Sequence, residues 1–187
     1  MSKPTPEQME HFYDLQKKGI ITCANLQAFL QKPDQFVTSF PTTFDQALGL
    51  TKLIQLAVGK KNINNINQNI TPERFKLTGT DVRTVMLELA PFLDDETGEA
   101  AAKRLVSEGY TLENTVELAA FLRQYPAEVE KYNAVVALGE DSRWTHPSGY
   151  VNVPFACVDG AHRDFNLSWF DYRFSSFSRI LVSRPSK

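Results

Sequence analysis

Cysteine is scarce in this sequence of 187 residues, which contains only Cys23 and Cys157. Two cysteines so far apart supply neither a disulfide framework nor a zinc site, so both are expected to be buried free thiols. Long apolar runs are missing too, since none approaches the ~18 residues that span a bilayer. The N-terminus also lacks the basic start and apolar stretch of a secretory signal. We therefore expect a cytoplasmic protein without a membrane span.

A strong excess of charge is also absent, because the formal net charge is -2 and the pI is ≈ 5.9. A chain so close to neutral has no bulk attraction for nucleic acid. The composition, 42% hydrophobic and 22% charged, is typical of globular proteins. The length suits one core with an extension.

Signals for helices dominate the first third of the chain. The run Thr5-Pro6-Glu7-Gln8 offers a cap, a proline at the first helical position and a capping-box partner, which favours a helix ending at Gly19. A second helix is expected from Thr22 to Pro33, and a third between Thr42 and Val58.

An Asn-rich polar run, Lys60 to Asn69, follows these predicted helices and lacks usable periodicity. Such a composition is typical of a surface loop or a joint between regions. We therefore expect an N-terminal helical region over residues 1–70 and a second domain over residues 71–187.

The second domain carries signals for both helices and strands. Helices are expected from Asp94 to Gly109 and from Thr111 to Pro126. The pair Asp159-Gly160 is the preferred sequence of a two-residue hairpin turn and is the strongest local signal in the chain. Alternating or β-branched apolar residues predict strands at Val82–Leu89, Val135–Leu138, Tyr150–Val158, Arg163–Phe170 and Ile180–Val182.

The stretch from Ala161 to Arg184 stands apart in composition. Rigid rings give contact area at low entropic cost, and Ser and Asn give adaptable hydrogen bonds, which is the mixture found in antibody binding loops. The alternative is that the rings only fill a core, since every second side chain of a strand faces inward. Six rings fall within thirteen residues and alternate with Ser, Asn and Asp: Phe165, Trp169, Phe170, Tyr172, Phe174 and Phe177.

Three stretches together resemble a known family. They are Gly109-Tyr110-Thr111-Leu112 leading into Leu118-Ala119-Ala120-Phe121, then Val136-Ala137-Leu138-Gly139 with Trp144, Gly149 and Val153-Pro154-Phe155, and finally Trp169-Phe170-Asp171 with Arg179-Ile180-Leu181-Val182-Ser183-Arg184. The pattern resembles the C-terminal half of bacterial proteins whose layout is similar to the C-type-lectin-like fold. Formylglycine-generating enzymes and the variable proteins of diversity-generating retroelements use that fold. The resemblance covers residues 80–187 and implies an α+β fold, in which a helix precedes a small antiparallel sheet.

A resemblance to the variable proteins implies a codon signature. Their retroelements mutate template adenines, which turns Asn codons into NNY codons that never encode Lys, Glu, Gln, Met or Trp. Residues 156–179 contain none of the first four types. Chance leaves such a gap about one time in fifty at ordinary residue frequencies. The resemblance thus implies a hypervariable C-terminal surface, with Trp169 as an invariant scaffold residue.

Two departures from the wider fold class narrow the expected chemistry. Only Trp169-Phe170-Asp171 resembles the calcium-binding sequences of sugar lectins, so calcium-dependent sugar binding is not expected. The paired active-site cysteines of the formylglycine-generating enzymes are also missing, because Cys157 has no cysteine neighbour. We expect neither a metal nor a cofactor.

An enzyme would need titratable groups that converge. The only tight cluster is His162-Arg163-Asp164, which could combine a base, an anion clamp and an orienting carboxylate. Its place just past the expected turn favours a solvated role, and phosphate-loop, metalloprotease and nucleophile-elbow motifs are absent. We expect a binding protein rather than an enzyme. A structural or interaction protein that acts through the N-terminal helices is the remaining alternative.

The expected ligand is a macromolecule, in first place a protein, bound by one exposed patch. Tyr172, Arg173 and Phe177 would be its energetic anchors and the serines its adaptable rim. The expected patch comprises Asn166, Ser168, Asp171, Tyr172, Arg173, Ser175, Ser176, Phe177 and Ser178. The expected scaffold comprises Phe165, Leu167, Trp169, Phe174, Leu181 and Val182.

Overall fold

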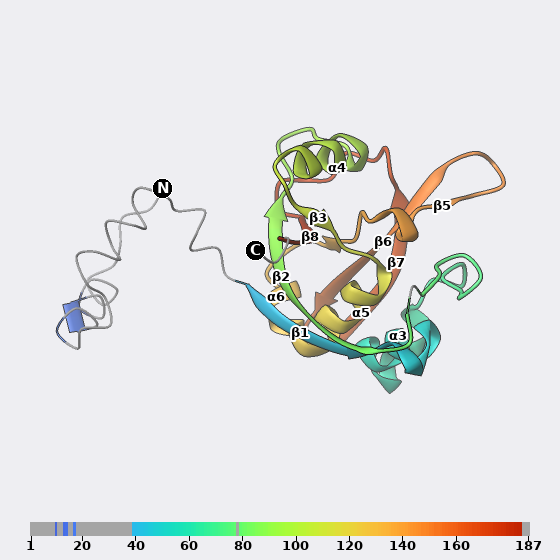
Figure 1. The fold of residues 1–187 in the computed structure, drawn as a ribbon, viewed down its shortest axis with the longest axis horizontal. Helices are drawn as coiled ribbons and strands as arrows, with labels where there is room; N and C mark the ends of the chain where they lie inside the picture. The colour runs from blue at the N-terminus through green and yellow to red at the C-terminus, as the bar shows by residue number, and fades with distance from the viewer. Residues whose placement is uncertain (1–9, 11–12, 15–16, 18–38, 78, 185–187) are drawn as a thin grey trace. The chain divides into compact units, whose positions relative to one another are not determined.

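The computed structural model describes residues 10, 13–14, 17, 39–77 and 79–184 (Figure 1). The chain divides into two compact units, one up to Thr38 and one from Ser39 onward. Most of the two helices predicted before Pro33 lies outside the described residues. All strands of the described residues belong to the second unit.

The second unit mixes strands and helices along the chain. Its strands are β1 (Phe40–Asp45), β2 (Val82–Pro91), β3 (Thr111–Leu112), β4 (Val135–Val136), β5 (Trp144–Thr145), β6 (Val151–Asp159), β7 (His162–Trp169) and β8 (Arg179–Ser183). Its α-helices are α3 (Leu50–Val58), α4 (Gly98–Ser107), α5 (Thr115–Gln124) and α6 (Pro126–Val129). Short 3-10 helices are η2 (Gln46–Leu48), η3 (Lys60–Asn65) and η4 (Glu140–Ser142).

The described strands form one eight-stranded sheet with the order β1-β2-β8-β4-β6-β5, in which β7 pairs with β6 and β3 with β8. All pairs are antiparallel except β4 with β8. Strand β8 lies between β2 and β4, and its Ile180, Leu181 and Val182 are fully buried. A continuous apolar run is what a strand covered on both faces requires. The prediction of a final central strand at Ile180–Val182 is therefore confirmed, as is the mixed α+β class.

Helices cover both faces of this sheet (Figure 1). On one face α3 and α5 pack against the side chains of Val135, Leu181 and Phe165. On the other face α4 packs against Val136 and Ile180, whose positions alternate with those of the first set. The sheet is therefore the middle layer, and the face under α4 is the one on which the candidate site lies.

The hairpin of β6 and β7 follows the predicted Asp159-Gly160 signal, with the turn one residue further on. Asp159 pairs with His162, so Gly160 and Ala161 form the two-residue loop. Gly160 has a φ of 56°, which a residue without Cβ adopts at no steric cost. A glycine at the first central position is the requirement of a type II′ turn.

The helix predicted between Thr42 and Val58 is only partly correct. Its first residues form strand β1, which pairs with β2 from Phe40 to Asp45, and the α-helix begins at Leu50 after Gly49. Phe44, which falls within the predicted helix, is a buried residue of strand β1 instead. Pairing with a distant strand overrides the local helical pattern here.

The boundary predicted at residue 70 does not separate two units among the described residues. Residues 39–70 contribute β1 and α3 to the same compact unit as the sheet. The Asn-rich run, predicted to be a loop or a joint, begins instead with the 3-10 helix η3 over Lys60–Asn65, and it packs on the hairpin. The Asn62 amide donates to the carbonyls of Val58 and Ala161, both at 3.0 Å, and the amide N–H of Asn67 donates to the Phe165 carbonyl at 2.9 Å. These amides therefore join the run to β7.

Among the described residues, no helix combines the length and the apolar character needed to cross a membrane. The longest described helices, α4 and α5, contain ten residues each. A helix needs about 20 residues to span the hydrocarbon core.

Candidate functional site

Residues Phe170–Ser178 join β7 to β8, and we refer to them as the C-terminal loop. The first turn of α4 holds one end of this loop. The backbone N–H of Glu99 donates to the Phe170 carbonyl at 3.0 Å, and that of Gly98 donates to the Tyr172 carbonyl at 3.2 Å. The first N–H groups of a helix lack hydrogen-bond partners within the helix. The loop carbonyls therefore provide partners for the N–H groups of α4, and the same hydrogen bonds hold the loop in place.

The start of α4 is itself fixed by side chains. The Thr97 hydroxyl accepts a hydrogen bond from the Ala100 N–H at 3.2 Å, so Thr97 caps the helix. Glu96 accepts from Arg104 at 2.8 Å and from the Leu93 N–H at 3.0 Å. The hydrogen bond from Arg104 holds the pKa of the Glu96 carboxyl below its usual range. Thr97 therefore caps α4, and Glu96 ties the residues before the helix to Arg104 within it.

The other end of the loop is held by the residues before β4. The N–H of Asn133 donates to the Phe177 carbonyl at 3.1 Å, and the N–H of Arg179 donates to the Ala134 carbonyl at 2.9 Å. In the middle, the ring of Phe174 is buried and stacks on Phe92 with centroids 4.7 Å apart. The loop is thus fixed by its backbone and one buried ring.

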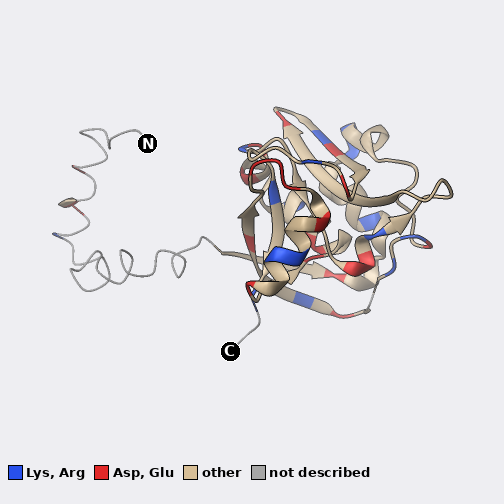
Figure 2. Cartoon of the chain, turned by 90° about the horizontal axis from the view of Figure 1, so that it is seen from above, with Lys and Arg blue, Asp and Glu red and all other residues tan. Residues whose placement is uncertain are grey.

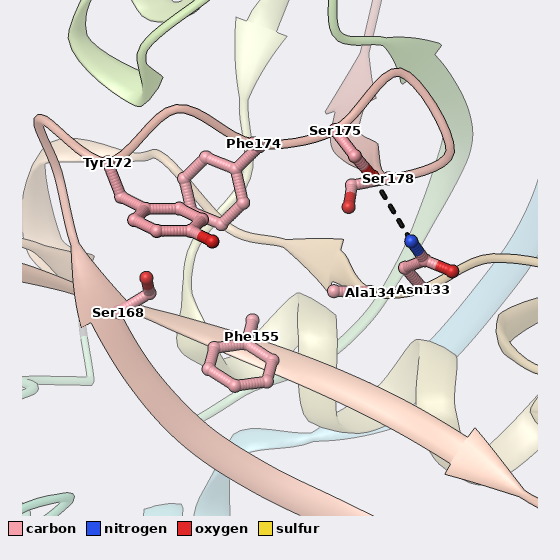
Figure 3. Close-up of a pocket in the computed structure, with 8 residues that line it drawn as sticks. All are labelled: Asn133, Ala134, Phe155, Ser168, Tyr172, Phe174, Ser175 and Ser178. Carbon is pink, nitrogen blue, oxygen red and sulfur yellow. Dashed lines mark hydrogen bonds between the residues drawn. The ribbon is translucent and has the colours of Figure 1, made fainter.

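A pocket of about 330 Å³ lies between the C-terminal loop and the sheet (Figure 3). Figure 3 shows the ring of Phe155 on one side, that of Phe174 on another, and the hydroxyls of Ser168 and Tyr172 turned toward the space between them. Four of the predicted patch residues contribute to it. Its lining is Asn133, Ala134, Phe155, Ser168, Tyr172, Phe174, Ser175 and Ser178.

The predicted patch residues differ in exposure. Ser178 is only 4% exposed, and Asn166 and Ser168 are half-buried in β7. Asn166 accepts a hydrogen bond from the Asn67 amide at 2.6 Å, so part of its polar capacity is already used. These three residues are not part of a fully exposed surface. Asn166 and Ser168 lie within strand β7, and Ser178 is the last residue before strand β8. The exposed members are Asp171, Tyr172, Arg173, Ser175, Ser176 and Phe177.

Trp169 was predicted to be a buried scaffold residue, and this prediction is wrong. Its side chain is 56% exposed and stacks on Tyr150 with ring centroids 5.7 Å apart. Trp169 is the last residue of β7, where the α3 and α5 layer no longer covers the strand. Of the other predicted scaffold residues, Phe165, Phe174, Leu181 and Val182 are buried, and Leu167 packs against the core from a half-buried position.

Sequence reasoning missed three residues that line the pocket from outside the C-terminal loop, namely Asn133, Ala134 and Phe155. Phe155 faces Asn166 across the β6–β7 pair, and Val153 faces Ser168. The register of the predicted hairpin could have placed Phe155 beside the patch, because paired residues share a face. Asn133 and Ala134 reach the pocket through contacts between distant segments, for which the sequence carries no local signal.

The catalytic alternative does not form one constellation. Adjacent residues of a strand point to opposite faces, so Arg163 faces away from His162 and Asp164. Arg163 donates to the Ala57 carbonyl at 3.0 Å. Asp164 accepts from the Cys157 thiol, with the sulfur and oxygen 3.7 Å apart. Burial and the neighbouring Asp164 raise the pKa of the Cys157 thiol to about 11, which keeps it protonated at neutral pH.

Cys157 is a free thiol, as predicted, but it is half-buried rather than buried, and Cys23 lies outside the described residues. Within the described part of the chain, no three His, Cys, Asp or Glu side chains gather as metal ligands would. A closed protein metal site generally needs three or four such ligands.

Replacing Gly98 with alanine is expected to move the C-terminal loop. A Cβ at this position would lie 2.7 Å from the Phe170 carbonyl oxygen, which is closer than van der Waals contact allows. Alanine favours a helix by about 1 kcal/mol over glycine, yet overpacking costs about 1–3 kcal/mol, so we expect a lower urea midpoint. Amide chemical shifts of residues 170–174 should change as well. Glu99→Ala, one residue along on the exposed side, is the control, and equal effects of the two variants would contradict this contact.

The described elements carry charges of both signs. Figure 2 shows acidic and basic residues interspersed over the described elements, and the pocket lining contains only uncharged side chains. The geometry is that of a recess with two aromatic walls and polar groups at its rim, next to a loop of exposed side chains. No family model, no curated protein and no solved structure matches this chain.

Proposed function

We propose that this chain is a ligand-binding protein with a C-type-lectin-like domain, and that its C-terminal loop presents a hypervariable surface to a protein ligand. The observation that carries the proposal is the separation of roles within the loop. Backbone hydrogen bonds and the buried ring of Phe174 hold the loop, while six of its nine side chains are exposed. A surface diversified by mutation needs this separation, because its side chains must change without unfolding the protein.

The exposed side chains themselves suit protein recognition. Tyr172 is 51% and Phe177 70% exposed, and both stand on a backbone fixed at either end. Rigid aromatic residues surrounded by serines are typical of paratopes, and Tyr and Arg are enriched among residues that dominate binding energy. Arg173 donates to the Asp95 backbone carbonyl at 3.4 Å, and its guanidinium lies 3.9 Å from the exposed Asp95 carboxylate, a contact that water screens. Most of the Arg173 side chain remains exposed to a ligand.

The order of elements supports the C-type-lectin-like part of the proposal. Helix α5 precedes the irregular run of strands β4, β6, β7 and β8, which is the layout that the resemblance implies. The last strand carries the Arg179-Ile180-Leu181-Val182 stretch in the centre of the sheet. The stretch without Lys, Glu, Gln or Met, residues 156–179, contains the whole exposed loop.

The proposal predicts a sharp contrast in tolerance to randomisation. We expect that NNY codons at the six exposed positions leave most clones folded, because those side chains contribute little to the core. The readout is the fraction of surface-displayed clones that resist protease. The randomised positions are Asp171, Tyr172, Arg173, Ser175, Ser176 and Phe177.

A matched library tests the same codons at six buried positions. It should be almost entirely protease-sensitive, since most core truncations cost about 2–5 kcal/mol and single domains are stable by about 5–15 kcal/mol. Equal survival of the two libraries would contradict the proposed division of roles. The control positions are Phe165, Phe174, Ser178, Ile180, Leu181 and Val182.

The genomic locus provides an independent test of hypervariability. A near-copy of the segment that encodes residues 156–179, differing almost only at template adenines and close to a reverse transcriptase gene, is expected. A locus without such a repeat would leave a fixed binding surface and remove the retroelement from the proposal.

A further inference from the structure

The pocket beneath the C-terminal loop has the features of a subsite for a single side chain. Its volume of about 330 Å³ is at the low end of the ~300–1,000 Å³ typical of ligand sites, so it suits one ring-sized group. Energetic anchors of protein interfaces insert into such pockets near the centre of the contact. A pocket of this size beside an exposed loop therefore suits an anchor residue of a partner.

The walls of the pocket are suited to an aromatic ring. Phe174 is held by stacking on Phe92, and Tyr172 lies edge-on to Phe174 with centroids 5.2 Å apart and planes at 83°. Phe155 faces them from strand β6 (Figure 3). Rings prefer stacked or edge-to-face neighbours at about 4.5–7 Å, so a further ring between these walls would find favourable contacts.

Polar groups at the pocket have unused capacity. Among the hydrogen bonds of the described residues, the Ser175 hydroxyl accepts from the Asn133 amide at 3.1 Å. The hydroxyls of Ser168, Tyr172 and Ser178 also face the cavity, and within the described residues none of them has a side-chain hydrogen bond (Figure 3). A ligand that fills the pocket must replace the water around these groups, which favours one with its own hydrogen-bonding tip.

The same surroundings disfavour a charged ligand group in the pocket. None of the eight lining residues has a charged side chain. The nearby Arg179 donates to the Ser176 and Ser178 carbonyls, both at 2.8 Å, and covers the ring of Tyr132. A charged group buried here would lose hydration without gaining a counter-charge.

We propose that this pocket accepts a tyrosine side chain of the protein ligand, with the ring between Phe155 and Phe174 and the phenol hydroxyl among the serine hydroxyls. The inference rests on the proposed function, since it names the group that the same surface recognises. Tyrosine is the natural side chain that combines an uncharged ring with a hydroxyl that both donates and accepts.

The experiment uses N-acetyl-tyrosinamide as the probe and the full chain labelled with ¹⁵N. We expect saturable shifts of the backbone amides of Ser168, Tyr172 and Ser175 as the probe is added. N-acetyl-phenylalaninamide should bind about three- to tenfold more weakly, because it lacks one hydrogen bond. The amides of N-acetyl-glutamate and N-acetyl-lysine should bind at least about tenfold more weakly than the tyrosine probe, since their charges would be buried unpaired.

A pair of variants separates the pocket from the rest of the protein surface. Ser175→Trp places a large ring at the pocket and should weaken the tyrosine probe at least about tenfold. Ser107→Trp places the same ring at an exposed serine at the end of α4, which neither lines the pocket nor belongs to the C-terminal loop, and should leave affinity for the probe unchanged. Both variants should keep dispersed amide spectra.

Three results would overturn the assignment: probe shifts that do not saturate or lie elsewhere, charged probes that bind as well as the tyrosine probe, or equal binding by the two tryptophan variants. Each can be observed in a protein whose exposed positions still tolerate randomisation. Failure of the tyrosine subsite is thereby distinguished from failure of the hypervariable surface, which depends on the libraries alone.

Discussion

Replacing Phe165 with alanine is expected to lower the free energy of unfolding by about 3–5 kcal/mol, the range for removing a large ring from a core. Phe165 is fully buried and lies in the core between the sheet and helices α3 and α5. Its backbone also pairs with Ala156 and with the segment at Ile66. The loss should appear as a lower urea midpoint with an unchanged slope.

Trp169→Ala is the matched comparison, on the same strand and with an even larger ring. Because Trp169 is 56% exposed, its truncation should cost only about 1 kcal/mol, mainly the stacking on Tyr150. If Trp169→Ala proved as destabilising as Phe165→Ala, the exposure of the strand end would be contradicted. Tyr172→Ala, at 51% exposure, should resemble Trp169→Ala.

The strands were predictable where local pattern and tertiary environment agree. Val82–Leu89, Val135–Leu138 and Tyr150–Val158 correspond to β2, β4 and β6, since β-branched or alternating residues there suit a pleated surface between two layers. The Asp159-Gly160 signal located the hairpin because a turn is determined by a few adjacent residues. A helix was also expected in the right region, but from Asp94, whereas α4 begins at Gly98 after the Thr97 cap.

The failures share a physical cause, which is dependence on distant partners. Strand β1 exists because it pairs with β2, nearly 40 residues later, and its Thr43 backbone also exchanges hydrogen bonds with the Gln124 side chain at 3.2 and 2.8 Å. Alternation gave Trp169 the same face as the buried Phe165, but it carries no information on how far the covering layer extends. Periodicity predicts the face of a side chain, whereas burial depends on what lies opposite.

The candidate site, like the fold, was predictable only where the signal lies in adjacent residues. Composition identified the C-terminal loop and its exposed members, because a mixture of rings and serines is visible in sequence. The pocket needed four segments brought together, namely the loop, strands β6 and β7, and the residues before β4. Only the loop and Ser168 of β7 were assigned to the site from sequence.

The second large effect expected is a fall in stability as pH rises through the neutral range, caused by Glu113. This residue lies between β3 and α5 and is 6% exposed. Burial raises the pKa of its carboxyl from the ordinary 4.5 to about 7, and the neighbouring Glu117 acts in the same direction. A hydrogen bond with Ser183 and the charge of Arg83 act in the opposite direction. Burial also raises the pKa of Glu117.

The sign follows from proton binding. Between pH 4.5 and about 7 the folded protein holds a proton on Glu113 that the unfolded chain has released, so raising the pH favours unfolding. The stabilisation that comes from protonated Glu113 is fully present below pH 4.5, the ordinary pKa. It is lost as the pH rises through about 7, the pKa of this carboxyl in the folded protein. The difference between these two pKa values corresponds to about 3 kcal/mol in the free energy of unfolding.

Glu113→Gln should remove most of this pH dependence, because glutamine is isosteric with the protonated acid and does not ionise. We expect the variant to be more stable than the parent at pH 8 and about equally stable at pH 4.5, as measured by urea unfolding across the range. The control is Glu99→Gln, which alters an exposed carboxylate paired with Lys103 at 2.8 Å and should leave the neutral-range slope in place. A parent protein whose stability rises from pH 5 to pH 8, or a Glu113→Gln variant that keeps the parent slope, would mean that the buried carboxyl is ionised in the fold.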